Sequence, residues 1–160
     1  MTYRLSITTL VLAAALAGCA TPSAPVSVSD SIAGNPALST LNGLVAKAGL
    51  TDTLQAGGPY TVFAPNNDAF KAVPAKTLDE LAQDPAKLKA VLAYHVLPVK
   101  ATAADIKNSN AKTLNGADVA LSKTGSFVTV EDAVVQQADI VASNGVVHVV
   151  DRVLLPPVKR

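Results

Sequence analysis

The chain has 160 residues, enough for one domain with short extensions, and its hydrophobic fraction of 49% can fill a core. Charged residues make up only 16% and the formal net charge is +1. Without a cluster of Lys or Arg, this balance argues against nucleic acid as a partner, because phosphate binding needs a basic patch. Aromatic residues are few, at 4% with no Trp, so we expect an aliphatic core.

Residues 1–18 have the features of an export signal. Arg4 precedes an apolar run over residues 7–17, which is too short to span a bilayer as a mature helix. The run ends in Leu16-Ala17-Gly18-Cys19, and a cysteine after such residues resembles the acylation site of bacterial lipoproteins. We therefore expect cleavage before Cys19 and lipidation of Cys19, with palmitate among the acyl chains, so that the protein is membrane-anchored. The alternative is an ordinary signal peptide in which the cysteine is coincidental.

Cys19 is the only cysteine, which excludes a disulfide within the chain. Residues 19–29 predict a flexible tether after the lipidated cysteine, because Pro22 and Pro25 lie among small polar residues. Ala20, rather than Asp, directly after the cysteine is typical of lipoproteins of the outer membrane or cell surface. We expect a monomer in the bacterial cell envelope, with its domain at residues 30–157 and a tail at 158–160.

The first half of the domain predicts helices and one early strand. Apolar residues recur at helical spacing between residues 38 and 48, and Gly49 follows as a stop signal. Asn66 and Asp84 are both suited to cap a helix, and Pro85 is favoured at a first helical position. Strand-forming residues occupy 60–64. The expected helices are 51–55, a segment after Asn66, and 85–97 before Pro98, in addition to 38–48.

The second half predicts strands joined by two hairpins. Asn115-Gly116 and Asn144-Gly145 are strong hairpin signals. Residues 146–150 are apolar on both faces, which indicates a central strand covered on both sides. The other expected strands are 112–114, 119–121, 127–130, 134–136 and 138–142. Because helices come first and strands later, we predict an α+β fold with helices packed on an antiparallel sheet or sandwich.

Three segments together resemble the fasciclin domain family. They are residues 60–70, the pair Tyr94-His95, and residues 144–156, in the order and approximate spacing of the family. The resemblance covers about residues 30–157. Asn66 stands where the family often has Thr, and either residue can cap a helix. The resemblance implies a wedge-shaped β-sandwich with helices packed around it.

The resemblance also implies a function as an extracellular adhesion or interaction module with protein or glycan partners. It brings no catalytic activity and no cofactor, so we do not expect an enzyme. In animal members a Tyr-His pair and an Asp-Ile pair are implicated in integrin binding. The candidate interaction residues are accordingly Tyr94, His95, Asp139 and Ile140.

Each candidate also has a structural explanation. His95 lies on the apolar face of its helix and is expected to be buried and hydrogen-bonded, with Asp68 as a plausible partner. Tyr94 faces another side and is the better surface candidate. His148 is likewise expected to be a buried structural polar residue, while alternation alone explains a core Ile140 beside a solvated Asp139 at a strand end.

Three other functions remain as alternatives. His95, His148 and Asp68 form a possible metal ligand set, but the histidines are isolated in sequence and we expect no metal. An aliphatic domain can hold a pocket between sheet and helices, which suggests a carrier of a small apolar ligand. An envelope hydrolase would need a nucleophile beside His95 or His148, and no motif supplies one.

Overall fold

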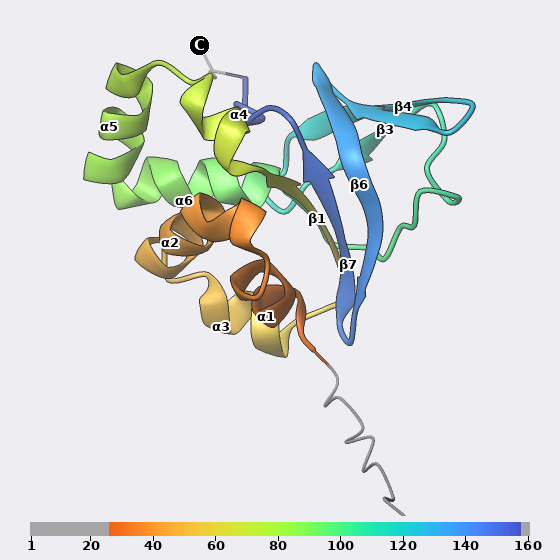
Figure 1. Cartoon of the computed structure of the whole chain (residues 1–160), viewed down its shortest axis with the longest axis horizontal. Helices are drawn as coiled ribbons and strands as arrows, with labels where there is room; N and C mark the ends of the chain where they lie inside the picture. The colour runs from red at the N-terminus through yellow and green to blue at the C-terminus, as the bar shows by residue number, and fades with distance from the viewer. Residues whose placement is uncertain (1–25, 158–160) are drawn as a thin grey trace, which may run out of the picture.

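The computed structural model describes residues 26–157, which form a set of helices packed against one mixed β-sheet (Figure 1). The expected signal peptide, the expected lipidation at Cys19 and the tail at 158–160 lie outside the described residues. The α+β class predicted from the order of elements is confirmed. None of the described helices is long and apolar enough to cross a bilayer.

The helices arise largely where caps and periodicity predict them. Asn66 Oδ1 accepts a hydrogen bond from Ala69 N at 2.7 Å. The Asp84 carboxylate caps the helix that begins at Pro85. Gly49, with φ of +67°, ends the second helix in the left-handed region that glycine tolerates. The helical elements are α1 Val28–Ala33, the 3₁₀ turn η1 Pro36–Leu38, α2 Ser39–Lys47, α3 Thr51–Ala56, α4 Asn67–Lys71, α5 Ala75–Gln83 and α6 Pro85–Tyr94.

Helix α1 occupies part of the segment whose composition indicates a tether. The Ser27 hydroxyl accepts from Asp30 N at 3.1 Å and donates to the Asp30 carboxylate at 2.7 Å, which caps the helix. Val28 is completely buried. Residues 27–29 therefore belong to the folded domain, and the expected tether is too long by these residues.

The sheet has seven strands in the order β2-β1-β7-β6-β5-β4-β3. β1 and β7 are parallel and every other neighbouring pair is antiparallel, so the sheet is mixed rather than purely antiparallel. Val96 and Leu97 form β2, whereas periodicity assigns them to the end of α6. The strands are β1 Tyr60–Pro65, β2 Val96–Leu97, β3 Ser109–Lys112, β4 Asp118–Thr124, β5 Phe127–Val130, β6 Ala133–Ala142 and β7 Gly145–Val150.

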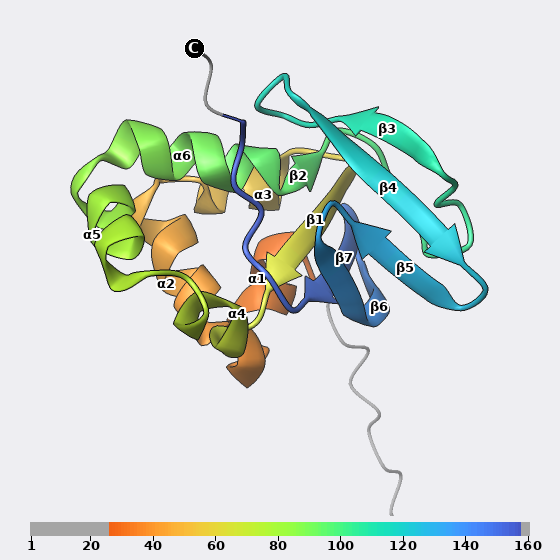
Figure 2. The same cartoon turned by 90° about the horizontal axis from the view of Figure 1, so that it is seen from above.

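The central pair β1–β7 is covered on both faces, as the apolar pattern of residues 146–150 predicts. All six residues of β7 are buried. Val62 and Val147 face an aliphatic core beneath the helices. On the other face, Phe63 and Val150 pack against residues of β4 and β5, because the sheet folds over at β6 (Figure 2). The two layers expected of a sandwich are thus two parts of one continuous sheet.

The β6–β7 hairpin forms where the Asn-Gly signal predicts it, but for a different reason. Ala142 pairs with Gly145, so Ser143 and Asn144 make the turn. The Asn144 side chain accepts from Val28 N at 2.8 Å and donates to carbonyls of residues 54–57. A Cβ atom at Gly145 would overlap the carbonyl of Tyr60 on the neighbouring strand. This glycine is needed for close strand approach.

Candidate interaction site

Tyr94, the last residue of α6, is buried, with only 3% of its surface exposed. Its hydroxyl lies 3.2 Å from the carbonyl oxygen of Asp118 and 3.3 Å from Glu131 Oε1. Burial, and then the nearby Glu131 carboxylate, raise the pKa of Tyr94. The expectation that Tyr94 is a surface residue is therefore wrong.

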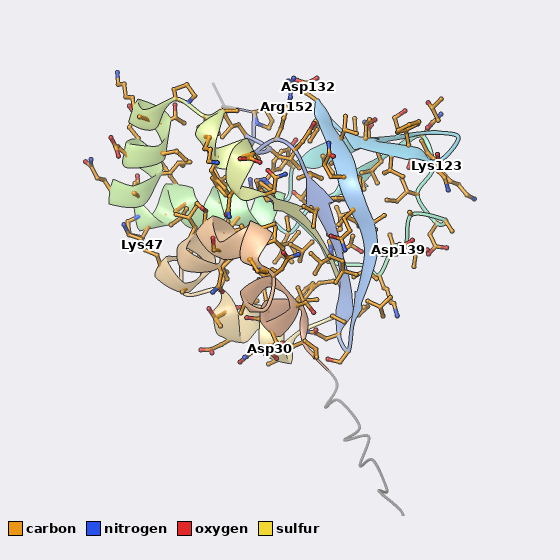
Figure 3. All side chains as sticks on the ribbon, in the orientation of Figure 1. Asp30, Lys47, Lys123, Asp132, Asp139 and Arg152 are labelled. Carbon is orange, nitrogen blue, oxygen red and sulfur yellow. The ribbon has the colours of Figure 1, made fainter. Side chains whose placement is uncertain are left out.

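The Tyr94 hydroxyl nevertheless reaches an open cleft of about 430 Å³. The starts of β4 and β6 form one wall, and the segment after β7 forms the other. Figure 3 shows Asp132 and Arg152 together at this end of the molecule. The lining residues include acidic, basic and apolar side chains: Tyr94, Asp118, Glu131, Asp132, Ala133, Arg152, Val153, Leu154, Leu155 and Pro157.

Glu131 fixes the acidic wall of this cleft. It joins β5 to β6 with φ of +52°, a backbone conformation that is uncommon for a residue other than glycine. Its Oε1 accepts from Ala120 N at 2.8 Å, besides the contact with Tyr94. No sequence signal identifies Glu131, because its role depends on a turn conformation and on a contact with another strand.

His95 is buried and hydrogen-bonded, as its position on the apolar face of α6 predicts, but its partners are backbone groups. Its Nε2 accepts from Leu154 N at 2.9 Å, so the ring proton is on Nδ1, which donates to the Val91 carbonyl at 2.8 Å. Burial lowers the pKa of His95 to about 4, although the Val91 contact opposes the shift. This neutral ring joins α6 to the segment after β7.

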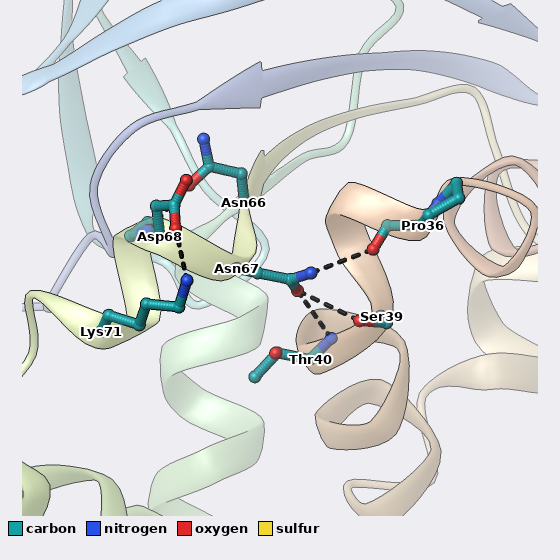
Figure 4. A network of polar contacts seen from close by, with 8 residues as sticks. Pro36, Ser39, Thr40, Asn66, Asn67, Asp68 and Lys71 are labelled. Atoms are coloured by element: carbon teal, nitrogen blue, oxygen red, sulfur yellow. Dashed lines mark hydrogen bonds and ion pairs between the residues drawn. The ribbon is translucent and has the colours of Figure 1, made fainter.

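Asp68 is not the partner of His95. Figure 4 shows it on the exposed side of α4, where its carboxylate pairs with Lys71 Nζ at 2.7 Å. The neighbouring Asn67 has the longer-range role, because its side chain accepts from Thr40 N at 3.0 Å and donates to the Pro36 carbonyl at 2.9 Å. The prediction of Asp68 as a structural polar residue that pairs with the buried His95 is wrong, and Asn67 joins α4 to α2.

His148 is a buried connector on the other face of the β1–β7 pair. Its Nδ1 accepts from Asp139 N at 3.2 Å, and its Nε2 donates to the Ala101 carbonyl at 2.9 Å. The ring stacks on Phe63 with 5.6 Å between centroids. Burial lowers the pKa of His148, while the Ala101 contact and the Asp139 charge oppose the shift. The structural interpretation of His148 is supported by these contacts.

Asp139 and Ile140 lie within β6, at an irregularity of the strand, and not at its end. Asp139 has φ of +58° and an exposed side chain, whose Oδ1 accepts from Ala103 N at 2.7 Å. Ile140 is partly buried against the helix-side core. Asp139 therefore also holds the loop between β2 and β3, a role that alternation did not reveal.

The structure does not assemble the sites required by the alternative functions. Among residues 26–157, no three His, Cys, Asp or Glu side chains gather as a metal site. Both ring nitrogens of His95 and of His148 contact backbone groups, so neither ring is positioned to activate a nucleophile. The enclosed hollow between helices and sheet is only about 10 Å³, roughly the space for one water. The apolar-carrier hypothesis is therefore wrong for that location.

A family model, the fasciclin domain, matches residues 36–156. Protein sll1483 from Synechocystis is 43% identical over 146 residues, covering 90% of this chain and 81% of that protein. The cell surface glycolipoprotein MPB83 from Mycobacterium bovis is 36% identical, and the match covers 81% of this chain and 60% of that protein. The transforming growth factor-beta-induced protein ig-h3 from Sus scrofa is 39% identical over 83% of this chain, which spans only 20% of that protein.

Among solved structures, a FAS1 domain pair from the insect cell adhesion molecule Fasciclin I has a TM-score of 0.67. The match covers 81% of this chain and 51% of the pair, at 16% sequence identity. At this identity the similarity concerns the fold.

Proposed function

Because this chain belongs to the fasciclin domain family, we propose that it is a lipid-anchored adhesion module of the bacterial envelope. Its partner is a protein or a glycan of the envelope or of a neighbouring surface. The name of one similar protein, a cell surface glycolipoprotein, supports this class of function. The Leu16-Ala17-Gly18-Cys19 segment supports anchoring by lipids on Cys19.

The observation that carries the proposal is the cleft at Tyr94. Within residues 26–157, neither Asp132 nor Arg152 makes an ion pair, although both line the cleft. Leu155, at 51% exposed, adds an apolar surface beside them. Charged groups of both signs around an apolar wall are suited to a polar macromolecular partner, because recognition then combines direction with burial.

The cleft is tested with a pair of matched charge reversals. Arg152→Glu changes the cleft, and Lys76→Glu makes the same change of charge on exposed α5. After purification of a partner by cross-linking to the wild-type protein, we expect Arg152→Glu to weaken its binding about tenfold, which corresponds to about 1.4 kcal/mol. Equal affinity of both variants for the partner, with unchanged melting temperatures, would place the contact surface elsewhere.

The anchor is tested separately by metabolic labelling with an alkyne analogue of palmitate. The wild type is expected to carry the label and to sediment with membranes. Cys19→Ser should lose both properties, while the neighbouring Thr21→Ser should keep them. A labelled Cys19→Ser protein, or an unlabelled wild type, would contradict the lipid anchor.

A further inference from the structure

The β6–β7 turn lies at the end of the molecule where the described chain begins (Figure 1). The Val26 carbonyl accepts a hydrogen bond from Ser143 N at 2.8 Å. Two residues later, Val28 N donates to Asn144 Oδ1 at the same distance. These contacts hold the start of the described domain against the turn, so Val26 lies at this end of the molecule.

Three exposed valines lie on segments that meet at this end of the molecule. Val26 is 45% exposed, Val99 is 50% exposed and Val141 is 65% exposed. Val141 precedes the turn by two residues and lies across from Val146. Val146 in turn lies beside Thr61, whose hydroxyl donates to the Val99 carbonyl at 2.7 Å. The strand register therefore brings segments that are far apart in sequence to one surface.

A shallow hollow beside these valines contains very little charge. Its lining is Ala56, Gly57, Gly58, Pro59, Lys100, Ser143, Asn144 and Gly145. Of these described residues only Lys100 is charged. Acidic side chains lie beyond this lining and keep their charge: the Asp30 carboxylate accepts from Ser27, and Asp139 Oδ1 accepts from Ala103 N. An apolar surface with one lysine matches a lipid headgroup region.

The length of the preceding chain favours the same partner. Cys19 lies seven residues before Val26, and a fully extended chain of that length spans at most about 25 Å. Acylation of Cys19 therefore confines this end of the domain to a thin layer next to the bilayer. Confinement raises the local concentration of lipid around weak contacts, so a few exposed side chains are enough to set an orientation.

We propose that the face formed by Val26, Val99, Lys100 and Val141 rests on the lipid surface in which Cys19 is anchored. This inference rests on the proposed lipid anchor. The valines contact the interface and Lys100 contacts lipid phosphates. Asp132 and Arg152 lie at the opposite end of the molecule (Figure 3), so this orientation presents the Tyr94 cleft to partners away from the membrane.

The chain has no tryptophan, which allows a direct optical test. The chain from Cys19 onward, which is the expected mature protein, carries Val141→Trp and is attached through its Cys19 thiol to maleimide lipid, in vesicles of phosphatidylethanolamine, phosphatidylglycerol and a lipid with brominated acyl chains. Phe127→Trp is the control, because Phe127 is 68% exposed and begins β5, away from this face. We expect emission from Val141→Trp to shift to the blue and to be quenched about twofold, since the ring enters the interface.

Emission from Phe127→Trp should be unaffected by the brominated lipid. Adding Lys100→Glu to Val141→Trp should reduce the quenching. Equal quenching of both tryptophans, or quenching of neither, would overturn the proposal. A blue shift of Val141→Trp emission that is caused by a protein partner, but not by lipid, would overturn it too. Because the attachment is chemical, the result does not depend on acylation in cells. Failure of the labelling experiment on Cys19→Ser and failure of this face are therefore distinguishable.

Discussion

The two faces of the β1–β7 pair each contain one buried histidine, and the two sites differ in what they connect. His95, in the helix-side core, joins its own helix to the segment after β7. His148, on the opposite face, joins the irregular part of β6 to the loop between β2 and β3. Each ring accepts one backbone N–H and donates to one carbonyl. In both sites a neutral histidine ring pairs with backbone N–H and C=O groups in irregular segments, where no strand or helix supplies their hydrogen-bond partners.

Both sites depend on the close contact of β1 with β7, so a large effect is expected at Gly145. Gly145→Ala places a Cβ atom against the Tyr60 carbonyl and should lower the free energy of unfolding by about 3 kcal/mol. The control is Gly43→Ala on α2, where a Cβ atom meets nothing within 4 Å. That change should stabilise the protein by about 0.5–1 kcal/mol. Urea denaturation measures both, and equal effects would contradict the strand contact.

Replacing each histidine by alanine tests the two sites independently. His95→Ala should destabilise the fold by about 3 kcal/mol, because it opens a cavity and leaves Leu154 N without its acceptor. His148→Ala should cost about 2 kcal/mol, because it leaves Asp139 N and the Ala101 carbonyl without their partner. Native-state hydrogen exchange should show faster exchange of Leu154 in the first variant only. If Asp139 responded equally in both variants, the two sites would not be independent.

The pKa of His95 predicts how stability depends on pH. Its folded value of about 4 lies below the ordinary 6.5, so the unfolded chain binds the proton more tightly between these values. Stability from this group is complete above pH 6.5 and falls as the pH drops toward 4, by about 3 kcal/mol in total. Denaturation curves at several pH values measure the slope. His95→Phe should flatten it, and an unchanged slope would assign the dependence to other groups.

The smallest effect is expected at Asp139. Asp139→Asn keeps the oxygen that accepts from Ala103 N and tolerates the positive φ, so stability should change by less than about 0.5 kcal/mol. Because the Asp139 charge raises the pKa of His148, the amide should lower that pKa further. An NMR titration of the His148 ring measures the shift. A rise in the pKa would contradict the electrostatic influence of Asp139.

Sequence patterns predict the regular parts of this molecule well. The apolar stretch at 146–150 indicates a central strand, and the caps at Asn66 and Asp84 begin helices where expected. These features are local, because a cap or an alternating pattern depends on residues that are close in sequence. The family resemblance carried by residues 60–70, Tyr94-His95 and residues 144–156 is confirmed by the family match.

The candidate site was less predictable because its contacts join backbone groups that are distant in sequence. Leu154 N is an ordinary backbone donor, so no pattern identifies it as the partner of His95. Tyr94 follows a helical face that looks exposed until β4 and Glu131 cover it. Val96 and Leu97 continue the helical periodicity of α6, but their pairing with β1 makes them a strand. In each case a tertiary contact outweighs a local preference.

The position of Asn144 also constrains when the domain can assemble. Its side chain contacts backbone groups near residues 28 and 54–57, so the earliest helices are secured by a residue close to the end of the chain. Contacts across such long loops form late, because closing the loop costs entropy before any contact stabilises it. A nascent chain that still lacks this residue cannot complete its native packing. The early helices therefore gain their last backbone contacts only when almost the whole domain is available.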